Sequence, residues 1–406
     1  MPWWQSIHRF LTPKRKNYSL IAGAALWLTW LVSISFGEGI FDLADQIIGT
    51  DYIQFYSAGL TLRLRNADQL YDFEYQKELQ ESLAGATLDS IHAFITPPFL
   101  AWLYLPFSIF PYMLSFLLWS VLSLAALWLS FIWLRLENPA RKYLWALSWF
   151  PVFASISFGQ NSLLSLAILS LTYYFWIANR RLAAGIVLSL LLYKPQLLLG
   201  VGLLWILEWR RDWKALLGLG LSSGVITSLS FWLLPIASQD YLVISRTILP
   251  RLQTVEGFPL WHAHTLRAFF LLLFPGQITL SYLFWILIST IAVIAFIRFW
   301  LVYRGNQPLL YAGAICLTVL VTPHAMIYDW VLLLIPAVLL WENKPELQKV
   351  LMAIFAIMWI ITIISGSLTY YQYQSLSHAI QISVLIFIFS LTSLYLLLIK
   401  IPSTSY

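Results

Sequence analysis

The longest polar stretch of the chain, residues 37–98, reads GEGIFDLADQIIGTDYIQFYSAGLTLRLRNADQLYDFEYQKELQESLAGATLDSIHAFITPP. It holds ten of the chain's eighteen carboxylates: Glu38, Asp42, Asp45, Asp51, Asp68, Asp72, Glu74, Glu78, Glu81 and Asp89. The remainder of the 406-residue chain is apolar, so that 60% of all residues are hydrophobic and only 10% are charged. Soluble domains carry roughly 25% charged residues. We therefore interpret residues 37–98 as a loop that an integral membrane protein holds outside the bilayer.

Apolar runs recur on both sides of this loop, and a run of about 20 residues crosses a bilayer core. Eight runs are predicted to span the membrane: Tyr18–Phe36, Tyr112–Leu134, Leu163–Ala178, Ala215–Leu234, Ile278–Val302, Met326–Trp341, Val350–Ser365 and Ala379–Ile399. Four further runs are shorter: Tyr143–Ser157, Leu182–Tyr193, Gln196–Leu207 and Leu309–Val321. The pattern predicts an all-α polytopic membrane protein, a single domain over residues 1–406 with about twelve membrane segments, several of them short or broken.

The positive charges decide the topology. If residues 182–207 formed one helix, Arg210, Arg211 and Lys214 would lie outside the cell, whereas two limbs hinged at Lys194 and Pro195 return them to the inside. The second arrangement obeys the positive-inside rule. We therefore predict a multi-pass protein of the cell inner (plasma) membrane with both termini cytoplasmic. Residues 37–98 and a second loop, residues 236–277, then lie on the extracytoplasmic side.

The short runs predict where the membrane helices break. A twelve-residue helix rises about 18 Å, which is well short of the roughly 30 Å hydrocarbon core. Such limbs are tolerated only where their freed backbone groups face protein or a wet cavity. Hinges are predicted at residues 158–161, 193–196 and 322–324. All three open toward the polar loop, so the sequence predicts a polar cavity at the outer leaflet.

Two helices are expected within the polar loop. Residues 51–65 should form an interfacial helix that buries one apolar side, made of Ile53, Tyr56, Leu60 and Leu64. Residues 72–85 should form a second helix, with Asp72 as N-cap, Gly85 as its stop, and a buried stripe of Tyr75, Leu79 and Leu83. Residues 95–111 should then form a re-entrant or surface-lying segment.

Several short motifs occur in a fixed order along the chain. They are Asp51-Tyr52, Tyr56-Ser57-Ala58 and Leu70-Tyr71-Asp72; Pro97, Pro98, Leu105 and Pro106; Gly159-Gln160-Asn161; Ala184-Gly185; Tyr193-Lys194-Pro195-Gln196; and Thr322-Pro323-His324-Ala325-Met326-Ile327-Tyr328-Asp329. Together they resemble glycosyltransferase family 87, whose members include mannosyltransferases that use polyprenol-phosphate mannose. The likeness extends over roughly residues 51–341.

This resemblance implies a GT-C fold, in which a multispan helical enzyme takes its sugar from a polyprenyl phosphate rather than from a nucleotide. It also implies inverting transfer with a first-loop aspartate as base, which corresponds to Asp51. The mannosyltransferase branch often has a Trp and a His after a Ser-Pro pair, whereas this chain has Pro323-His324 followed by Tyr328-Asp329. The sugar and the acceptor are therefore not carried over from the family.

Asp51 and Lys194 are the main candidates for the chemistry. Asp51 lies in a polar stretch at the membrane boundary and is suited to act as general base; it could instead cap the helix that follows it. Asp45 is the competing base, and only the family pattern disfavours it. Lys194 lies at a hinge near the outer leaflet, where an ionisable group is a functional candidate by default. It would bind the donor phosphate, unless it only snorkels to the interface.

Six further residues complete the predicted substrate site. His324 at the third hinge would donate to the phosphate or pair with the base, although a structural histidine is as good an interpretation. Asp329 lies one turn into a span, where structural pairing with an arginine or tyrosine is expected. The others are Gln160 and Asn161, which would orient the sugar or phosphate, together with Tyr56 and Arg267.

The sequence identifies no cofactor. His262 and His264 resemble a metal-binding pair only weakly, because no third ligand stands out nearby, and the need for a divalent metal is left open. The expected partners are a polyprenyl-phosphate sugar donor, a glycan or lipid acceptor and membrane lipids, with no nucleic acid. The predicted function is a membrane hexosyltransferase, with mannose as the preferred sugar. A secondary transporter is an alternative, but it would need related halves, and the acidic loop has no counterpart in the second half. A lipid-linked glycan flippase or ligase is the other alternative.

Overall fold

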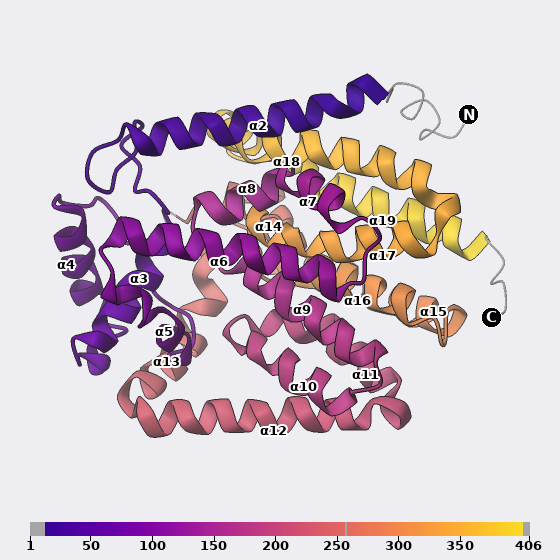
Figure 1. The fold of residues 1–406 in the computed structure, drawn as a ribbon, viewed down its shortest axis with the longest axis horizontal. Coiled ribbons are helices and arrows are strands. Elements are labelled where there is room, and N and C mark those ends of the chain that lie inside the picture. Colours follow the sequence, from indigo (N-terminus) through magenta and orange to yellow (C-terminus); the bar gives the residue numbers. More distant parts are fainter. Residues whose placement is uncertain (1–12, 256–257, 401–406) are drawn as a thin grey trace.

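The computed structural model describes residues 13–255 and 258–400, in which all regular elements are helices apart from two isolated β-bridges. Within these described residues, six helices are long and apolar enough to cross a bilayer. They are α2 (Pro13–Ser35), α6 (Tyr112–Trp133), α12 (Trp209–Leu233), α15 (Ile278–Val302), α18 (Gln348–Leu376) and α19 (Ile382–Lys400). Figure 1 shows α2, α6 and α12 running along the long axis of the molecule. The prediction of an all-α polytopic membrane protein is confirmed.

Shorter helices fill the space between these spans, and they break where the sequence predicts hinges. Helices α8 (Phe150–Ser157) and α9 (Ser162–Ile177) meet at an angle of 120°. The other broken elements are α10 (Arg181–Ser189) with η3 (Leu190–Tyr193), η4 (Pro195–Leu198) with α11 (Leu199–Leu207), and α16 (Gln307–Val321) followed by η7 (Ile327–Leu333) and α17 (Leu334–Asn343). Pro195 and Pro323 follow the breaks because proline lacks the N–H that a continuing helix would need. The run predicted at Tyr143–Ser157 divides into α7 (Pro139–Leu147) and α8.

The polar loop forms a helical cluster at one end of the molecule. It contains α3 (Tyr52–Arg63), η1 (Ala67–Gln69) and α4 (Phe73–Ala84), and the segment after it adds α5 (Phe99–Tyr104) and η2 (Phe107–Ile109). Figure 1 places α3, α4 and α5 at this end together with α13, whereas the start of α2 and the end of α19 lie at the opposite end. The second loop supplies α13 (Pro235–Thr247), η5 (Leu249–Thr254), η6 (Leu260–His262) and α14 (Leu266–Leu273); η8 (Pro345–Leu347) precedes α18.

Helix α3 is not the interfacial helix that the sequence predicts. Nearly all its residues are buried, including the polar Ser57 and Thr61. The segment that follows folds back over it, so that the rings of Phe55 and Tyr104 stack at 4.9 Å. A Cβ at Gly59 would lie 2.5 Å from the carbonyl of Tyr104, which explains glycine at this contact. An amphipathicity argument fails here because the cover comes from α5, a separate helix further along the chain.

Helix α4 begins and ends as predicted but buries a different face. The Asp72 carboxylate accepts hydrogen bonds from two backbone N–H groups of the first turn, and Gly85 ends the helix at φ +66°. Its two fully buried residues are Gln76 and Gln80. The predicted buried stripe is only partly buried: Tyr75, Leu79 and Leu83 all keep some exposure, although Leu79 and Leu83 pack against the core. The helix turns its glutamines inward because they bond the backbone of residues 92–94.

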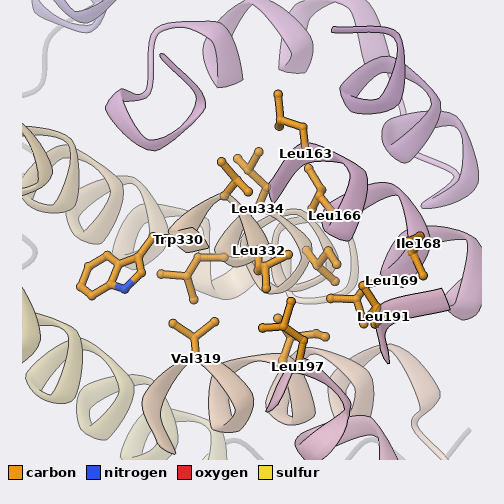
Figure 2. Packing of buried hydrophobic residues seen from close by; sticks show 14 of the residues in the cluster. Leu163, Leu166, Ile168, Leu169, Leu191, Leu197, Val319, Trp330, Leu332 and Leu334 are labelled. Carbon is orange, nitrogen blue, oxygen red and sulfur yellow. The ribbon is translucent and has the colours of Figure 1, made fainter. Parts of the chain in front are cut away.

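The apolar core surrounds the broken helices. Figure 2 shows leucines of α9, η3, η4 and η7 meeting Val319 of α16 and Trp330. Helix α11 approaches α16 so closely that a Cβ at Gly200 would lie 1.9 Å from the carbonyl of Ala314. The backbone N–H of Gly200 donates to Thr318 Oγ1 at 2.9 Å. This freed N–H at the start of α11 is thereby bound by protein rather than left to lipid, as a membrane interior requires.

Candidate active site

Asp51 lies immediately before α3, and its backbone is anchored to the α8–α9 hinge. Its N–H donates to the carbonyl of Phe158 at 2.9 Å. Although Asp51 occupies the N-cap position, its carboxylate makes no capping hydrogen bond. The side chain is 22% exposed. The structural interpretation as a helix cap therefore fails, and the carboxylate is available for another purpose.

Gln160 holds one oxygen of this carboxylate. Its Nε2 donates to Asp51 Oδ2 at 2.8 Å and to the Tyr328 hydroxyl at 3.1 Å. The hinge brings Gln160 there through Gly159, which has φ +68° and would place a Cβ 2.4 Å from Cβ of Tyr52. Only glycine fits such a position without strain. The structure therefore places the first hinge against the polar loop; that the two form a substrate site stays a prediction.

The second oxygen of Asp51 faces an imidazole that the sequence analysis did not single out. The Nδ1 atom of His92 lies 3.8 Å from Asp51 Oδ1, and the two side chains are 27% and 22% exposed. No pattern in the sequence marks His92, because it lies in an irregular segment more than 40 residues beyond Asp51.

Lys194 pairs with Asp329 rather than standing alone. Its Nζ lies 2.7 Å from Asp329 Oδ1, and the two side chains are only 14% and 6% exposed. The hydroxyl of Ser162 donates to the same oxygen at 2.6 Å, and the N–H of Met326 donates to Asp329 Oδ2 at 3.2 Å. Structural pairing was expected for Asp329, but the partner is a lysine, not an arginine or tyrosine. Lys194 does not snorkel outward, because its charge is satisfied inside the protein.

Tyr328 connects the Asp51–Gln160 pair to the Lys194–Asp329 pair. Its hydroxyl accepts from Gln160, and its ring centroid lies 5.5 Å from Lys194 Nζ. Asp51, Gln160, Tyr328, Lys194 and Asp329 thus form one continuous set drawn from the polar loop, the first two hinges and η7. Asp51 and Lys194 do not touch each other directly. The polar cavity predicted between them stays a prediction.

His324 lies beside this set, in the hinge between α16 and η7. Its Nδ1 is 3.5 Å from Gln253 Nε2, and its ring packs 6.0 Å from that of Phe258. Burial lowers the pKa of His324 to about 4, and the nearby Asp329 carboxylate only partly opposes this shift. His324 is therefore neutral at neutral pH and acts as a hydrogen-bonding group, not as a cation.

The remaining predicted residues lie in different surroundings. The buried guanidinium of Arg267 donates to the Pro250 carbonyl and, at 2.6 Å, to the Tyr282 hydroxyl, while its Nε has no partner among the residues that the structure describes. Asn161 is fully buried, and its carboxamide faces the Tyr104 hydroxyl. The Tyr56 hydroxyl donates to the Phe110 carbonyl at 2.8 Å. Tyr56 is thereby occupied in holding α3 to its cover, and we leave it out of the proposed site.

Among residues 13–255 and 258–400, no three His, Cys, Asp or Glu side chains are grouped so that they could hold a metal ion. His264 instead forms a 2.7 Å hydrogen bond with Ser383. Tyr328 and Ser162 are functional candidates that the sequence analysis did not name as site residues. Ser162 follows the predicted site residue Asn161, and Tyr328 precedes the predicted site residue Asp329. This adjacency in the sequence could have pointed to both.

The chain was compared with known proteins. The family model described as glycosyltransferase family 87 matches residues 94–323, which is more than half of the chain. The match begins after Asp51 and ends just before His324, so these two residues lie outside it. A search of curated proteins and a search of solved structures each found no match.

Proposed function

The chain belongs to glycosyltransferase family 87, and on that premise we propose that it moves a hexose, with mannose the preferred sugar, from a polyprenyl phosphate to a hydroxyl of a glycan or lipid. Family membership and the multi-pass fold make it a membrane glycosyltransferase. This favours glycosyl transfer over the secondary transport considered from the sequence. We place the reaction on the extracytoplasmic face, because the positive-inside rule puts the polar loop there.

The observation that carries the proposal is the hydrogen bonding and exposure of the Asp51 carboxylate. Gln160 donates to one carboxylate oxygen, the other lies 3.8 Å from His92 Nδ1, and the side chain remains partly exposed. A base must be oriented and yet reachable by its substrate. Asp51 Oδ1 would accept the proton of the acceptor hydroxyl while the hydroxyl oxygen forms a bond to the sugar C1. The bond between C1 and the phosphate oxygen then breaks, its electron pair leaves with the polyprenyl phosphate, and the anomeric centre inverts.

Lys194 and His324 would hold the leaving phosphate. An ammonium has three donor hydrogens, and contacts to Asp329 at 2.7 Å and Ser162 at 3.4 Å leave room for a further acceptor. The neutral imidazole of His324 can donate one hydrogen bond. Asp329 then fixes the lysine and balances its charge before the donor arrives, so that the buried cation is not left unpaired.

Two apolar cavities support a lipid-linked donor. One of about 310 Å³ is lined by α15 residues, including Trp285 and Val293, and by Val321; another of about 470 Å³ lies between η4, α11, α15 and α16 and shares Val293 and Val321 with the first. Val321 ends α16 directly before the His324 hinge, and Arg267 stacks over Trp285 at 5.9 Å. A polyprenyl chain would lie along these cavities with its phosphate turned toward the hinges. Arg267, with its unpaired Nε, would lie near the phosphate end.

The test is transfer by the purified chain in lipid nanodiscs. Polyprenyl-phosphate mannose and an extract of membrane glycolipids are supplied, and release of polyprenyl phosphate is measured together with labelling of the acceptor. Asp51→Asn should reduce turnover by about 10²-fold to 10⁴-fold, the typical value of a general base.

Asp45→Asn is the matched control, because Asp45 is exposed in the same loop and its backbone φ of +55° suits asparagine. It should leave turnover unchanged. Full turnover by Asp51→Asn would refute the base assignment, and a loss confined to Asp45→Asn would transfer that role. If wild-type protein transfers no hexose from any polyprenyl-phosphate donor, the proposed reaction is wrong.

A further inference from the structure

The segment that carries His92 is clamped to α4 by two buried glutamines. Gln80 Oε1 accepts from the N–H of His92 at 3.1 Å, and Gln80 Nε2 donates to the carbonyl of His92 at 2.8 Å. Gln76 forms the same pair of hydrogen bonds with Phe94: its Oε1 accepts from the N–H at 2.8 Å, and its Nε2 donates to the carbonyl at 3.4 Å. A side-chain amide that bonds both backbone groups of one residue substitutes for a strand partner. The clamp therefore fixes the position of His92 through its backbone alone.

The imidazole of His92 is consequently not needed to hold the segment. It points at Asp51, with Nδ1 3.8 Å from Oδ1, and both side chains remain open to the outside. This separation exceeds a direct hydrogen bond, for which about 2.7–3.2 Å is usual. An oxygen atom of a hydroxyl or water can lie within hydrogen-bond distance of both atoms at once. The oxygen of Asp51 that Gln160 does not occupy is the one that faces His92.

We infer that His92 is the proton relay of Asp51, an inference that rests on the proposed function. In the transfer step, Asp51 Oδ1 takes the proton of the acceptor hydroxyl and becomes a neutral carboxylic acid. That proton then moves to the unprotonated nitrogen of His92, directly or through one bridging water, and leaves the imidazolium for the outside solvent. Asp51 is thereby ionised again for the next turnover. Imidazole suits this task because it exchanges protons near neutral pH.

Other groups surround Asp51, but they are less suited to carry its proton away. Gln160 does not titrate in this range, and the hydroxyls of Tyr328 and Tyr112 are buried. His262 and His324 interact with Asp51 electrostatically from the second loop and the third hinge. Burial lowers the pKa of His324 to about 4, which disfavours the cation that a relay must form. Glu81 and Lys77 lie near the His92 segment, but their contacts are with other groups: the Glu81 carboxylate accepts from the N–H of Leu88 and lies 4.0 Å from Lys77 Nζ.

The experiment compares wild type, His92→Ala and His92→Gln in the nanodisc assay across pH 5.5 to 9. Neither substitution disturbs the clamp, which uses only the backbone of residue 92, and a thermal melt checks the fold of each variant. Both should lower kcat near pH 7 by about 10²-fold and leave the KM for the donor unchanged. The loss should shrink as the pH rises, because hydroxide and buffer then remove the proton. His378→Ala is the control, since His378 is an exposed imidazole bonded to the nearby Leu376 carbonyl.

The decisive measurement is whether added imidazole restores turnover. Imidazole should restore turnover of His92→Ala in proportion to its concentration but should not restore His92→Gln, whose side chain fills the space and carries no proton. Wild-type turnover by His92→Ala at every pH would overturn the relay, and so would a pH-independent loss without imidazole rescue. Retained activity in His92→Gln would also overturn it, because a hydrogen bond alone would then suffice. In all of these outcomes the wild type still transfers sugar; absence of wild-type transfer would instead overturn the proposed function together with the relay.

Discussion

The side-chain nitrogen of Gln160 lies 2.8 Å from Asp51 Oδ2, across 109 residues of sequence. This contact joins the polar loop to the first hinge, and it decides which carboxylate oxygen stays open. The same nitrogen reaches the Tyr328 hydroxyl at 3.1 Å. One amide group therefore links the candidate base to the segment that carries Asp329.

Gln160→Leu removes this donor while keeping a side chain of similar size. A hydrogen bond to a charged group contributes about 1.5–3 kcal/mol, so turnover should fall about tenfold to hundredfold, with little change in donor KM. Steady-state transfer kinetics measure both parameters. Gln46→Leu, a change at an exposed glutamine of the same loop, should have no effect. Unaltered kcat in Gln160→Leu would show that Asp51 needs no such orientation.

The pair of Lys194 and Asp329 has a structural and a catalytic role that mutagenesis can separate. Lys194→Met leaves a buried carboxylate unpaired, which should cost about 3–5 kcal/mol of stability. The double variant Lys194→Met/Asp329→Asn removes both charges and should regain most of this loss in thermal or SDS unfolding. Because the phosphate-binding cation is still missing, its donor KM should remain high. A double variant with wild-type donor KM would limit Lys194 to a structural role.

Gly202 tests the apolar cavities as the path of the donor lipid. It lines the larger cavity, and apart from its own helix no atom of the described residues lies within 4 Å of where its Cβ would be. Gly202→Leu should fill part of the cavity without destabilising α11, since leucine favours helix over glycine. The KM for a long-chain donor should rise several-fold, while that for a donor with a truncated lipid should change little. Gly220→Leu, at an equally open position on α12, serves as control; equal effects at both sites would argue against the cavity.

Acid should weaken the fold through buried histidines of the second loop. Burial lowers the pKa of His264 to about 3, assisted by the charge of His262. In the unfolded chain His264 binds a proton near pH 6.5, whereas in the folded chain it stays neutral down to about pH 3. Its contribution to the free energy of unfolding is therefore complete above pH 6.5 and is lost as the pH falls toward 3. Melting temperatures measured between pH 7.5 and 5 should drop less in His264→Gln than in wild type. Parallel pH curves for the two proteins would contradict this assignment.

Composition and local chemistry were enough to predict the membrane fold from the sequence. Apolar length identified the long spans, and the predicted Ile278–Val302 agrees with α15 at both ends. Pro195 and Pro323 marked two hinges because proline interrupts helices regardless of tertiary context. Asp72 and Gly85 marked the ends of α4 because capping depends on neighbouring backbone groups.

The tertiary structure alone decided the partners of each polar group. The sequence could not show that most of α3 is buried, that Lys194 pairs with a carboxylate 135 residues away, or that His92 faces Asp51. These relations depend on how broken helices and a long loop meet in space, and no local propensity encodes such a meeting. The sequence thus determined which segments enter the membrane and where they break, while packing of the breaks determined which side chains form the candidate site.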